Sequence, residues 1–347
     1  MSLTDTFIQV SERGLMPDFL IRVGIRNLCK KRLKQCQIEN CEKNAELAEE
    51  YLQQVDQSPL AVETEKANEQ HYEVPADFYH LVLGKNLKYS CCCYEPGTHG
   101  LNQAEDRALE LTCLRADLQD GQDILELGCG WGSLSLWMAK NFPNSRIRSV
   151  SNSNSQREYI MKTASERGLG NLEVVTADVN AFETDQFYDR VVSVEMFEHV
   201  RNHRQLFDRI HGWLKTGGKL FTHVFCHRST SYPFVVEGKD DWMSQHFFSG
   251  GTMPADELFL RICGKLELEH RWRWSGTHYA QTSEDWLLNL DRNKDAALAI
   301  FYRDQSKEDA HKSFHRWRIF FLACAETFAY AKGQEWWVSH YLFAKQG

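Results

Sequence analysis

The sequence lacks the cysteine spacing of a disulfide framework or a structural zinc site. It has 11 cysteines, an odd number, and no Cys-x-x-Cys pair. Many free thiols are typical of a reducing compartment, so we expect a cytoplasmic protein that binds no metal. Long apolar runs are lacking as well. No stretch reads as a signal peptide or a membrane span, so we expect no stable membrane insertion.

An excess of basic residues is also lacking. The chain has 40 Lys and Arg against 48 Asp and Glu, a formal net charge of −8. A nucleic acid partner requires a basic surface, so we expect none. Aromatic residues, in contrast, are plentiful at 12% and gather toward the C-terminal third. Such side chains suit a pocket for a flat or cationic small molecule. The composition is compatible with a homodimer.

The N-terminal segment 1–70 is predicted to be a helical extension. A helix is expected over 17–36, with a rough apolar stripe on one face, and residues 39–70 are expected to form another helix and then a linker. The other face of the first helix is basic. It either caps the fold as a solvated helix or contacts a membrane surface. The basic residues are Arg22, Arg26, Lys30, Lys31, Arg32 and Lys34.

Apolar runs alternate with helical patterns through the middle of the chain. This alternation predicts a doubly wound parallel α/β sheet covered by helices on both faces. We assign it to a core over 71–253. The region 254–347 is predicted to be mostly helical and to complete the sheet with a β-like piece at 266–274. The expected core strands are 124–127, 146–150, 172–176, 190–194 and 219–225, and the expected helices include 108–118, 155–167 and 203–214.

A glycine run, Gly128-Cys129-Gly130-Trp131-Gly132, joins the first strand to a helix. Such a loop lets a ligand approach the backbone. A dinucleotide site requires Gly-x-Gly-x-x-Gly and an acidic residue after the second strand. Here the third glycine comes one position early and the second strand ends in Ser151-Asn152-Ser153-Asn154. NAD is therefore disfavoured. Asp178 instead follows the third strand, where the methyltransferase version of this sheet holds adenine.

The segment Glu195-Met196-Phe197-Glu198-His199 follows the fourth strand. Methyl transfer from a sulfonium is an in-line displacement, which an enzyme promotes mainly by positioning. A protonated amine must also lose a proton before it can attack. Glu195 and Glu198, three residues apart, would share one face of a helical turn and hold the amine. His199 would act as the base. The alternative is an acid–histidine pair that only caps a helix.

Several long stretches resemble coclaurine N-methyltransferases and related plant alkaloid N-methyltransferases, within the wider cyclopropane-fatty-acid-synthase-like family. The similarity extends from about His71 to the C-terminus, and the last two stretches favour the amine branch. The stretches are Tyr72-Glu73-Val74-Pro75, Leu87-Lys88-Tyr89-Ser90-Cys91, Leu125-Glu126-Leu127-Gly128-Cys129-Gly130, Glu195-Met196-Phe197-Glu198-His199, Phe248-Ser249-Gly250-Gly251-Thr252-Met253-Pro254 and His278-Tyr279-Ala280-Gln281-Thr282-Ser283-Glu284.

The resemblance implies a Rossmann-like class I methyltransferase with a mostly parallel seven-stranded sheet, using S-adenosyl-L-methionine and releasing S-adenosyl-L-homocysteine. It also implies the cofactor contacts. The methionine part would meet Ser90 and Gly128, the ribose would meet Asn152 and Gln156, the adenine would meet Asp178 and Val179, and the Val194 backbone would lie near the sulfonium. Tyr89 and Gly130 are further expected cofactor contacts.

The resemblance names the trio Glu195, Glu198 and His199 as catalytic, with His199 as base and Glu198 holding the amine. In the cyclopropane synthases, residues matching Cys91, Glu198, His223 and Tyr279 hold a bicarbonate ion. A lipid-modifying enzyme acting on unsaturated acyl chains is therefore the alternative. The expected acceptor contacts are Cys91, His223, Tyr279, Phe248 and Trp336, with Phe234, Trp242, Phe247, Trp274 and Trp337 as further candidate walls.

Cys324 resembles a cysteine once proposed as catalytic in the synthases, but a buried small side chain on a helix is the favoured interpretation. A third alternative, a non-catalytic cofactor-binding protein, leaves the Glu-x-x-Glu-His segment without a purpose. The sequence therefore favours N-methylation of a small aromatic or alkaloid-like amine.

Overall fold

The computed structural model describes residues 3–36, 40–62, 74–235 and 241–347. The expected linker up to Gln70 and the Tyr72-Glu73 pair lie wholly or largely outside these residues. The N-terminal part is helical, as predicted. Its helices are α1 (Leu3–Glu12), α2 (Asp18–Cys36) and α3 (Cys41–Asp56), and α5 (Ala76–Val82) and α6 (Leu101–Arg115) follow within the region predicted to be the core.

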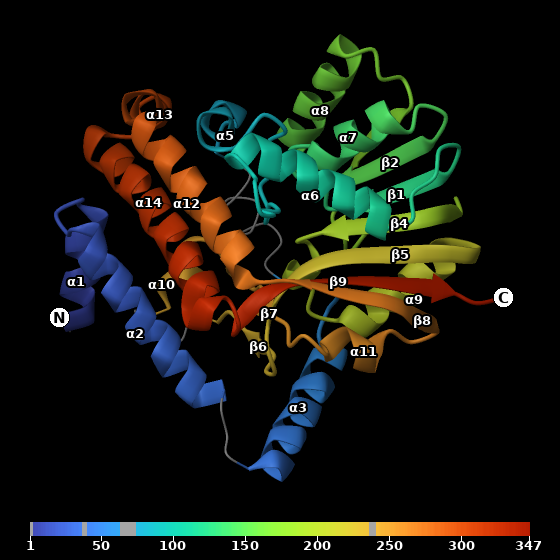
Figure 1. The fold of residues 1–347 in the computed structure, drawn as a ribbon, viewed down its shortest axis with the longest axis horizontal. Helices are drawn as coiled ribbons and strands as arrows, with labels where there is room; N and C mark the ends of the chain where they lie inside the picture. The colour runs from blue at the N-terminus through green and yellow to red at the C-terminus, as the bar shows by residue number, and fades with distance from the viewer. Residues whose placement is uncertain (1–2, 37–39, 63–73, 236–240) are drawn as a thin grey trace.

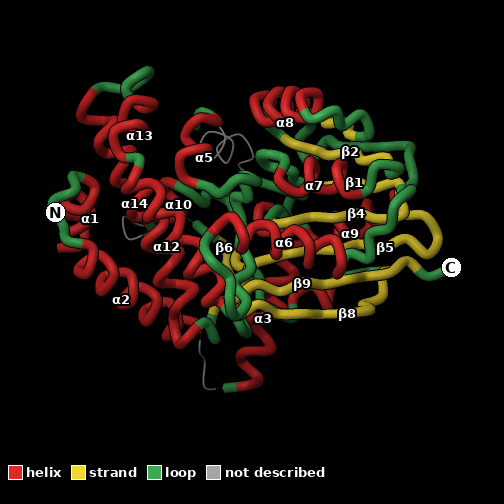
Figure 2. Tube along the Cα trace, turned by 45° about the horizontal axis from the view of Figure 1, so that its top comes forward, coloured by secondary structure: helices red, strands yellow, loops and turns green. Residues whose placement is uncertain are grey.

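The core is a seven-stranded sheet in the order β3-β2-β1-β4-β5-β9-β8 (Figures 1 and 2). β9 runs antiparallel to both of its neighbours, and the other neighbouring pairs are parallel, which confirms the predicted mostly parallel sheet. The strands are β1 (Asp123–Leu127), β2 (Arg146–Ser151), β3 (Leu172–Thr176), β4 (Tyr188–Val194), β5 (Leu214–His227), β8 (Leu266–Trp274) and β9 (Trp336–Lys345). A two-stranded sheet joins β6 (Tyr232–Pro233) to β7 (Thr252–Met253).

Helices cover both faces of the sheet because its strands alternate their buried side chains between two clusters. Ile124 of β1 packs with α6, α7 (Ser133–Asn141) and α8 (Asn154–Glu166). Leu125 and Leu127 face α3, α9 (His203–Trp213) and α11 (Leu258–Ile262). The period of two along a strand sends neighbouring residues to opposite layers. The result is a three-layer sandwich with the sheet in the middle.

A helical half lies beside the sheet on the side of the chain's N-terminus (Figure 1). It is built from α10 (Trp242–His246), α12 (Gly276–Arg292), α13 (Lys294–Phe301) and α14 (Lys307–Ala329), together with α1, α2 and α5. The basic helix α2 runs along α14. Its Arg22 binds Glu284 of α12 at 2.5 Å and Glu326 of α14 at 2.9 Å. Arg26 binds Glu326 at 2.6 Å. These two arginines hold α2 to the fold through the face that was expected to be solvated, and Phe19, Val23 and Leu28 of the expected apolar stripe are exposed instead.

Two sequence predictions about element ends were wrong. The helix expected over 108–118 begins earlier, at Leu101, and ends at Arg115. The strand expected over 219–225 begins earlier, at Leu214 directly after α9, and therefore includes Gly217 and Gly218. The β4–β5 register shifts between Tyr188 and Arg190, and this irregularity absorbs the two glycines within the strand.

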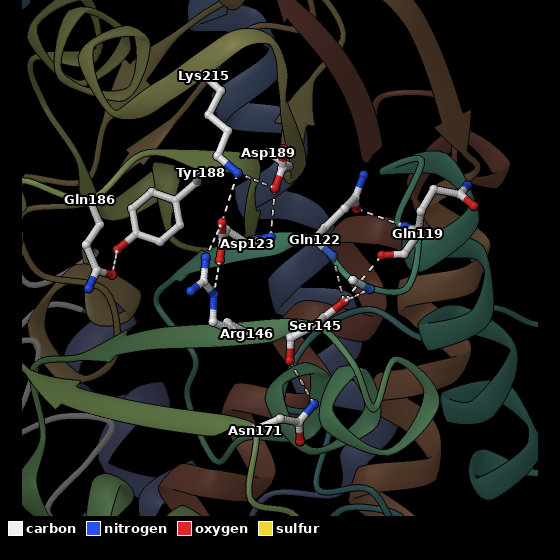
Figure 3. Close-up of polar contacts among 11 residues, drawn as sticks. Gln119, Gln122, Asp123, Ser145, Arg146, Asn171, Gln186, Tyr188, Asp189 and Lys215 are labelled. Atoms are coloured by element: carbon white, nitrogen blue, oxygen red, sulfur yellow. Dashed lines mark hydrogen bonds and ion pairs between the residues drawn. The ribbon is translucent and has the colours of Figure 1, made fainter.

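Ion pairs tie together the amino ends of the parallel strands (Figure 3). Lys215 of β5 contacts Asp123 of β1 at 2.8 Å and Asp189 of β4 at 2.7 Å. Arg146 of β2 binds Asp123 at 2.5 Å. Ion pairs thus occupy the edge of the sheet at the amino ends of the strands. A cavity lies at the opposite edge, where the parallel strands have their carboxyl ends. Among the helices that the structure describes, none is long and apolar enough to cross a membrane.

Candidate active site

A cavity of about 150 Å³ lies at the carboxyl ends of β1 to β4, the edge where open α/β sheets bind ligands. Each residue that the sequence analysis assigned to the cofactor lines this cavity. These residues are Tyr89, Ser90, Gly128, Gly130, Asn152, Gln156, Asp178, Val179 and Val194. The structure therefore brings together side chains from four strand ends and from the loop after α5. Their roles toward the cofactor stay predictions.

The glycine loop brings bare backbone to the cavity. Gly128 and Gly132 have φ values of 80° and 79°, which side chains rarely adopt. A Cβ at Gly128 would lie 2.6 Å from the Met196 side chain, and one at Gly132 would lie 2.6 Å from Ile160. No side chain caps the start of α7. The amide groups of its first turn are thus available to an anionic group such as an amino acid carboxylate.

Three buried donors on the cavity wall have no hydrogen-bond partner within the described part of the chain. They are Trp131 Nε1, Ser133 Oγ and Gln156 Nε2. The oxygen of Gln156 accepts from Ser151 Oγ at 2.7 Å, which fixes the amide so that its nitrogen remains to donate. Buried donors are rarely left unsatisfied. A ligand with several acceptors, such as a nucleoside joined to an amino acid, fits this wall.

The cavity residues that sequence reasoning missed include Trp131, Ser133, Lys88 and Glu126. Glu126 interrupts an apolar strand and accepts from Ser149 Oγ at 2.8 Å and from Ser135 Oγ. Burial raises its pKa to about 7. The sequence did contain a signal for Glu126, namely an acidic residue inside an apolar strand next to a glycine loop. Trp131 and Ser133 lie in or beside that loop, but nothing in the pattern separated them from packing residues.

A second and larger cavity, of about 770 Å³, lies between the sheet edge and the helical half. Tyr279, Phe248 and Trp336 line it, as do Phe234 and Trp242. Segments of α1, α2, α10 and α14 form the rest of its wall. Of the other aromatic candidates, Phe247, Trp274 and Trp337 do not line this cavity, and neither do Cys91 and His223.

Tyr89, Glu195 and His199 line both cavities. Glu195 follows β4 with a left-handed φ of 48°, and hydrogen bonds hold its carboxylate in place. Its Oε1 accepts from the Cys91 amide at 2.9 Å and lies 3.1 Å from His223 Nε2. Its Oε2 accepts from the Tyr279 hydroxyl at 2.6 Å. Burial raises the pKa of Glu195, while the charge of Lys88, the Tyr279 hydroxyl and the Cys91 amide favour its ionised form.

Glu198 lies in a different environment from Glu195. The 3₁₀ turn spans only Phe197–His199, and the left-handed Glu195 precedes it, so the shared helical face expected for Glu195 and Glu198 was wrong. Glu198 is fully buried and lines neither cavity. Its Oε1 accepts from the Phe225 amide at 2.7 Å. Burial, followed by the charge of Glu195, raises its pKa well above the ordinary value.

His199 is half-buried at the meeting point of the two cavities, with its ring 4.7 Å from that of Phe248. Burial lowers its pKa to about 4, while the negative charge of Glu195 acts in the opposite direction. The imidazole is therefore neutral near pH 7 and able to accept a proton. Burial also raises the pKa of Cys324, so its thiol stays neutral beside the larger cavity.

Comparisons with known proteins agree with this geometry. Residues 61–336 match the family model described as mycolic acid cyclopropane synthetase. (S)-coclaurine N-methyltransferase of Thalictrum flavum subsp. glaucum is 37% identical over 96% of this chain and 94% of its own. A crystal structure of coclaurine N-methyltransferase bound to N-methylheliamine and S-adenosylhomocysteine superposes with a TM-score of 0.95 at 34% identity, covering 99% of both chains. The cyclopropane synthase MmaA2 from Mycobacterium tuberculosis has a TM-score of 0.71 at 25% identity, over 83% of this chain and 100% of its own.

Proposed function

Because this chain belongs to the mycolic acid cyclopropane synthetase family and is an S-adenosylmethionine-dependent methyltransferase, we propose that it methylates the nitrogen of a small aromatic or alkaloid-like amine. Relatives that match nearly the whole chain are named for N-methylation of coclaurine and pavine. The observation that carries the proposal is the wall of Tyr89, Glu195 and His199 shared by two cavities.

The smaller cavity is the proposed cofactor site. Its glycine loop, uncapped helix start and unsatisfied donors suit the amino acid and nucleoside parts of S-adenosylmethionine. When bound, the cofactor supplies a methyl group on a sulfonium, which leaves as a neutral thioether. The larger cavity then presents the acceptor to the shared wall. Two reactants held in this way need little further help for an in-line displacement.

Glu195, rather than Glu198, is the proposed anchor for the acceptor ammonium, because its carboxylate lies at the shared wall. His199 is neutral and accepts one proton from the ammonium, so that the nitrogen regains its lone pair. That lone pair forms the new N–C bond. Because the free imidazole is a weak base, proton transfer depends on Glu195 stabilising the imidazolium. Phe248 and Phe234 add aromatic faces that attract a cation.

The carboxylate of Glu195 also argues against the alternative function, modification of unsaturated acyl chains. By resemblance, Cys91, Glu198, His223 and Tyr279 would hold bicarbonate. Here the Cys91 amide and the Tyr279 hydroxyl donate to Glu195, and His223 Nε2 lies 3.1 Å from the same carboxylate. The chain's own carboxylate thus satisfies three of the groups that an added anion would need. Activity independent of bicarbonate follows from this arrangement.

Label transfer tests the proposal. Methyl-labelled S-adenosylmethionine is offered to a panel of phenethylamine-type and isoquinoline-type amines in one tube and to unsaturated phospholipid vesicles in another. We expect label in the amine fraction, unchanged when bicarbonate is removed. Label in the acyl chains, lost on bicarbonate removal, would overturn the amine function and leave the cofactor site unaffected.

The site of action is proposed to be the cytoplasm. All 11 cysteines carry free thiols, which is the state maintained by a reducing compartment.

A further inference from the structure

A chain of hydrogen bonds leads from Glu195 away from both cavities and through the sheet. Glu195 Oε1 lies 3.1 Å from His223 Nε2, and His223 Nδ1 lies 2.9 Å from His340 Nε2. His340 Nδ1 lies 2.8 Å from Arg115 Nη1. The two histidines are direct partners in the β5–β9 pair, and Arg115 is the last residue of α6. His340 and Arg115 line neither cavity.

Both histidines of this hydrogen-bond chain, His223 and His340, are neutral. Each is completely buried, and burial lowers both pKa values well below the ordinary one, with Lys88 and Arg115 adding to the effect. A neutral imidazole has one donor nitrogen and one acceptor nitrogen. A group at one end of the hydrogen-bond chain that can only donate therefore decides the direction of all the hydrogen bonds in it.

Arg115 is that group, because a guanidinium can only donate. It donates to His340 Nδ1, so the proton of His340 must be on Nε2 and point to His223 Nδ1. His223 in turn carries its proton on Nε2 and donates it to Glu195 Oε1. The reverse direction, from a protonated Glu195, would set an N–H of His340 against an N–H of Arg115.

Two indoles hold the guanidinium in place. Its carbon lies 5.3 Å from the ring centre of Trp272 and 5.4 Å from that of Trp274. Trp274 also packs at 4.5 Å against His340 and at 5.4 Å against His223. Such contacts between a cation and an aromatic face stabilise a half-buried charge. Arg115 is therefore fixed at the far end of the chain while remaining charged.

We propose that Arg115 is a positioning residue for the methyl transfer: through His340 and His223 it fixes a donor on Glu195 Oε1 and keeps Glu195 an ionised carboxylate. The direction of the hydrogen bonds does not depend on the substrate, whereas the benefit to the acceptor ammonium rests on the proposed function. With Oε1 already accepting from the Cys91 amide and from His223, a proton on that oxygen is excluded.

Other charges also act on Glu195. Lys88 and His199 favour its ionised form, Glu198 interacts with it unfavourably, and Tyr279 donates to it. These groups stay in place when Arg115 is replaced. What Arg115→Met removes is the fixed direction of the chain. Glu195 can then hold a proton on Oε1 and donate it to His223, so its pKa rises and its ionised fraction falls.

Nitrogen-15 NMR of labelled histidine tests the direction itself. The His223 and His340 signals are assigned by comparison with His223→Gln and His340→Gln variants. In the native protein we expect both rings to carry their proton on Nε2. In Arg115→Met we expect a mixture with the Nδ1–H form. A native ring with its proton on Nδ1 would overturn the proposal, whatever the substrate.

Amine affinity in the presence of S-adenosylhomocysteine, measured against pH, tests the consequence. We expect Arg115→Met to move the acidic loss of affinity about one pH unit higher and to weaken binding about tenfold within that range. Arg115→Lys, which keeps a donor, should restore most of it. The control Arg107→Met also removes one positive charge from α6, at a position where Arg107 forms an exposed ion pair with Glu95. It should leave the dependence of amine affinity on pH unchanged. An unchanged pH profile in Arg115→Met, with unchanged S-adenosylhomocysteine affinity, would contradict the proposed role.

Discussion

At the scale of single residues, the proposed chemistry depends on one neutral histidine, His199. We expect His199→Ala to lower turnover at pH 7 by about 100- to 10,000-fold, the usual cost of losing a general base. Affinity for S-adenosylhomocysteine should change little, and part of the activity should return as pH rises and free amine becomes available. Steady-state kinetics against pH, with binding calorimetry, measure this. His270→Ala, at an exposed position on β8, is the control. Full turnover in the His199 variant would remove it from the mechanism.

Gly128, Asn152 and Asp178 of the smaller cavity were predictable from the sequence pattern, because each follows a strand and parallel strands end at one edge. The other predicted residues of this cavity, such as Ser90 and Gln156, came from the family resemblance. The environment of Glu195 was not predictable. Its partners His223 and Tyr279 are 28 and 84 residues away along the chain, and no local pattern links them. The different burial of Glu195 and Glu198 also depends on a left-handed φ at a non-glycine residue, which sequence does not signal.

At the scale of elements, His203 anchors the turn that carries Glu198 and His199. It begins α9, is fully buried, and its Nε2 bonds the Phe197 carbonyl at 2.9 Å. Burial lowers its pKa to about 4, below the value of about 6.5 in an unfolded chain. The unfolded state then binds more protons between these values. The stability that His203 contributes is therefore complete above pH 6.5 and is lost as pH falls toward 4.

His203→Gln keeps a donor for the Phe197 carbonyl but cannot titrate. We expect the difference in unfolding free energy between the native protein and this variant to shrink by about 2 kcal/mol from pH 8 to pH 5. Urea denaturation at several pH values measures this difference. His270→Gln, exposed on β8, should give a constant difference. A difference for His203→Gln that stays constant as well would show that the buried ring does not titrate in this way.

The bounds of the helices and strands were predicted from the sequence with different accuracy. The strands at 172–176 and 266–274 have the predicted bounds, because each is a short run with clear ends. The start of α6 was missed because Gly100 precedes it and no side chain caps it. Glycines usually mark a break, but the pair at Gly217-Gly218 is absorbed by a change of strand register, a feature that only pairing with β4 reveals.

At the scale of the whole molecule, the proposed cofactor cavity lies at the sheet edge, and α1 and α2 form part of the wall of the proposed acceptor cavity. Arg22→Met removes the bonds that tie α2 to α12 and α14. We expect KM for the amine to rise several-fold while KM for S-adenosylmethionine stays constant. Lys30→Met, an exposed position on the same helix, is the control. Equal changes in both KM values would indicate a general loss of structure instead.

The larger cavity could not be predicted as a unit, because α1, α2, β5, α10, α12 and α14 all contribute to it. The sequence indicated that its aromatic residues were numerous. It did not indicate which ones face a ligand, since this depends on how separate helices pack. Trp274, for example, packs on His223 and His340 and lines neither cavity.

The central claim is that donor and acceptor meet at the wall shared by the two cavities. A crystal structure with S-adenosylhomocysteine and an amine that the enzyme turns over tests it most directly. We predict the cofactor product beside Gly128 and Asp178, with the amine nitrogen within about 3 Å of the Glu195 carboxylate or the His199 ring. An amine nitrogen bound away from both side chains, or a cofactor product outside the glycine-loop cavity, would contradict the account.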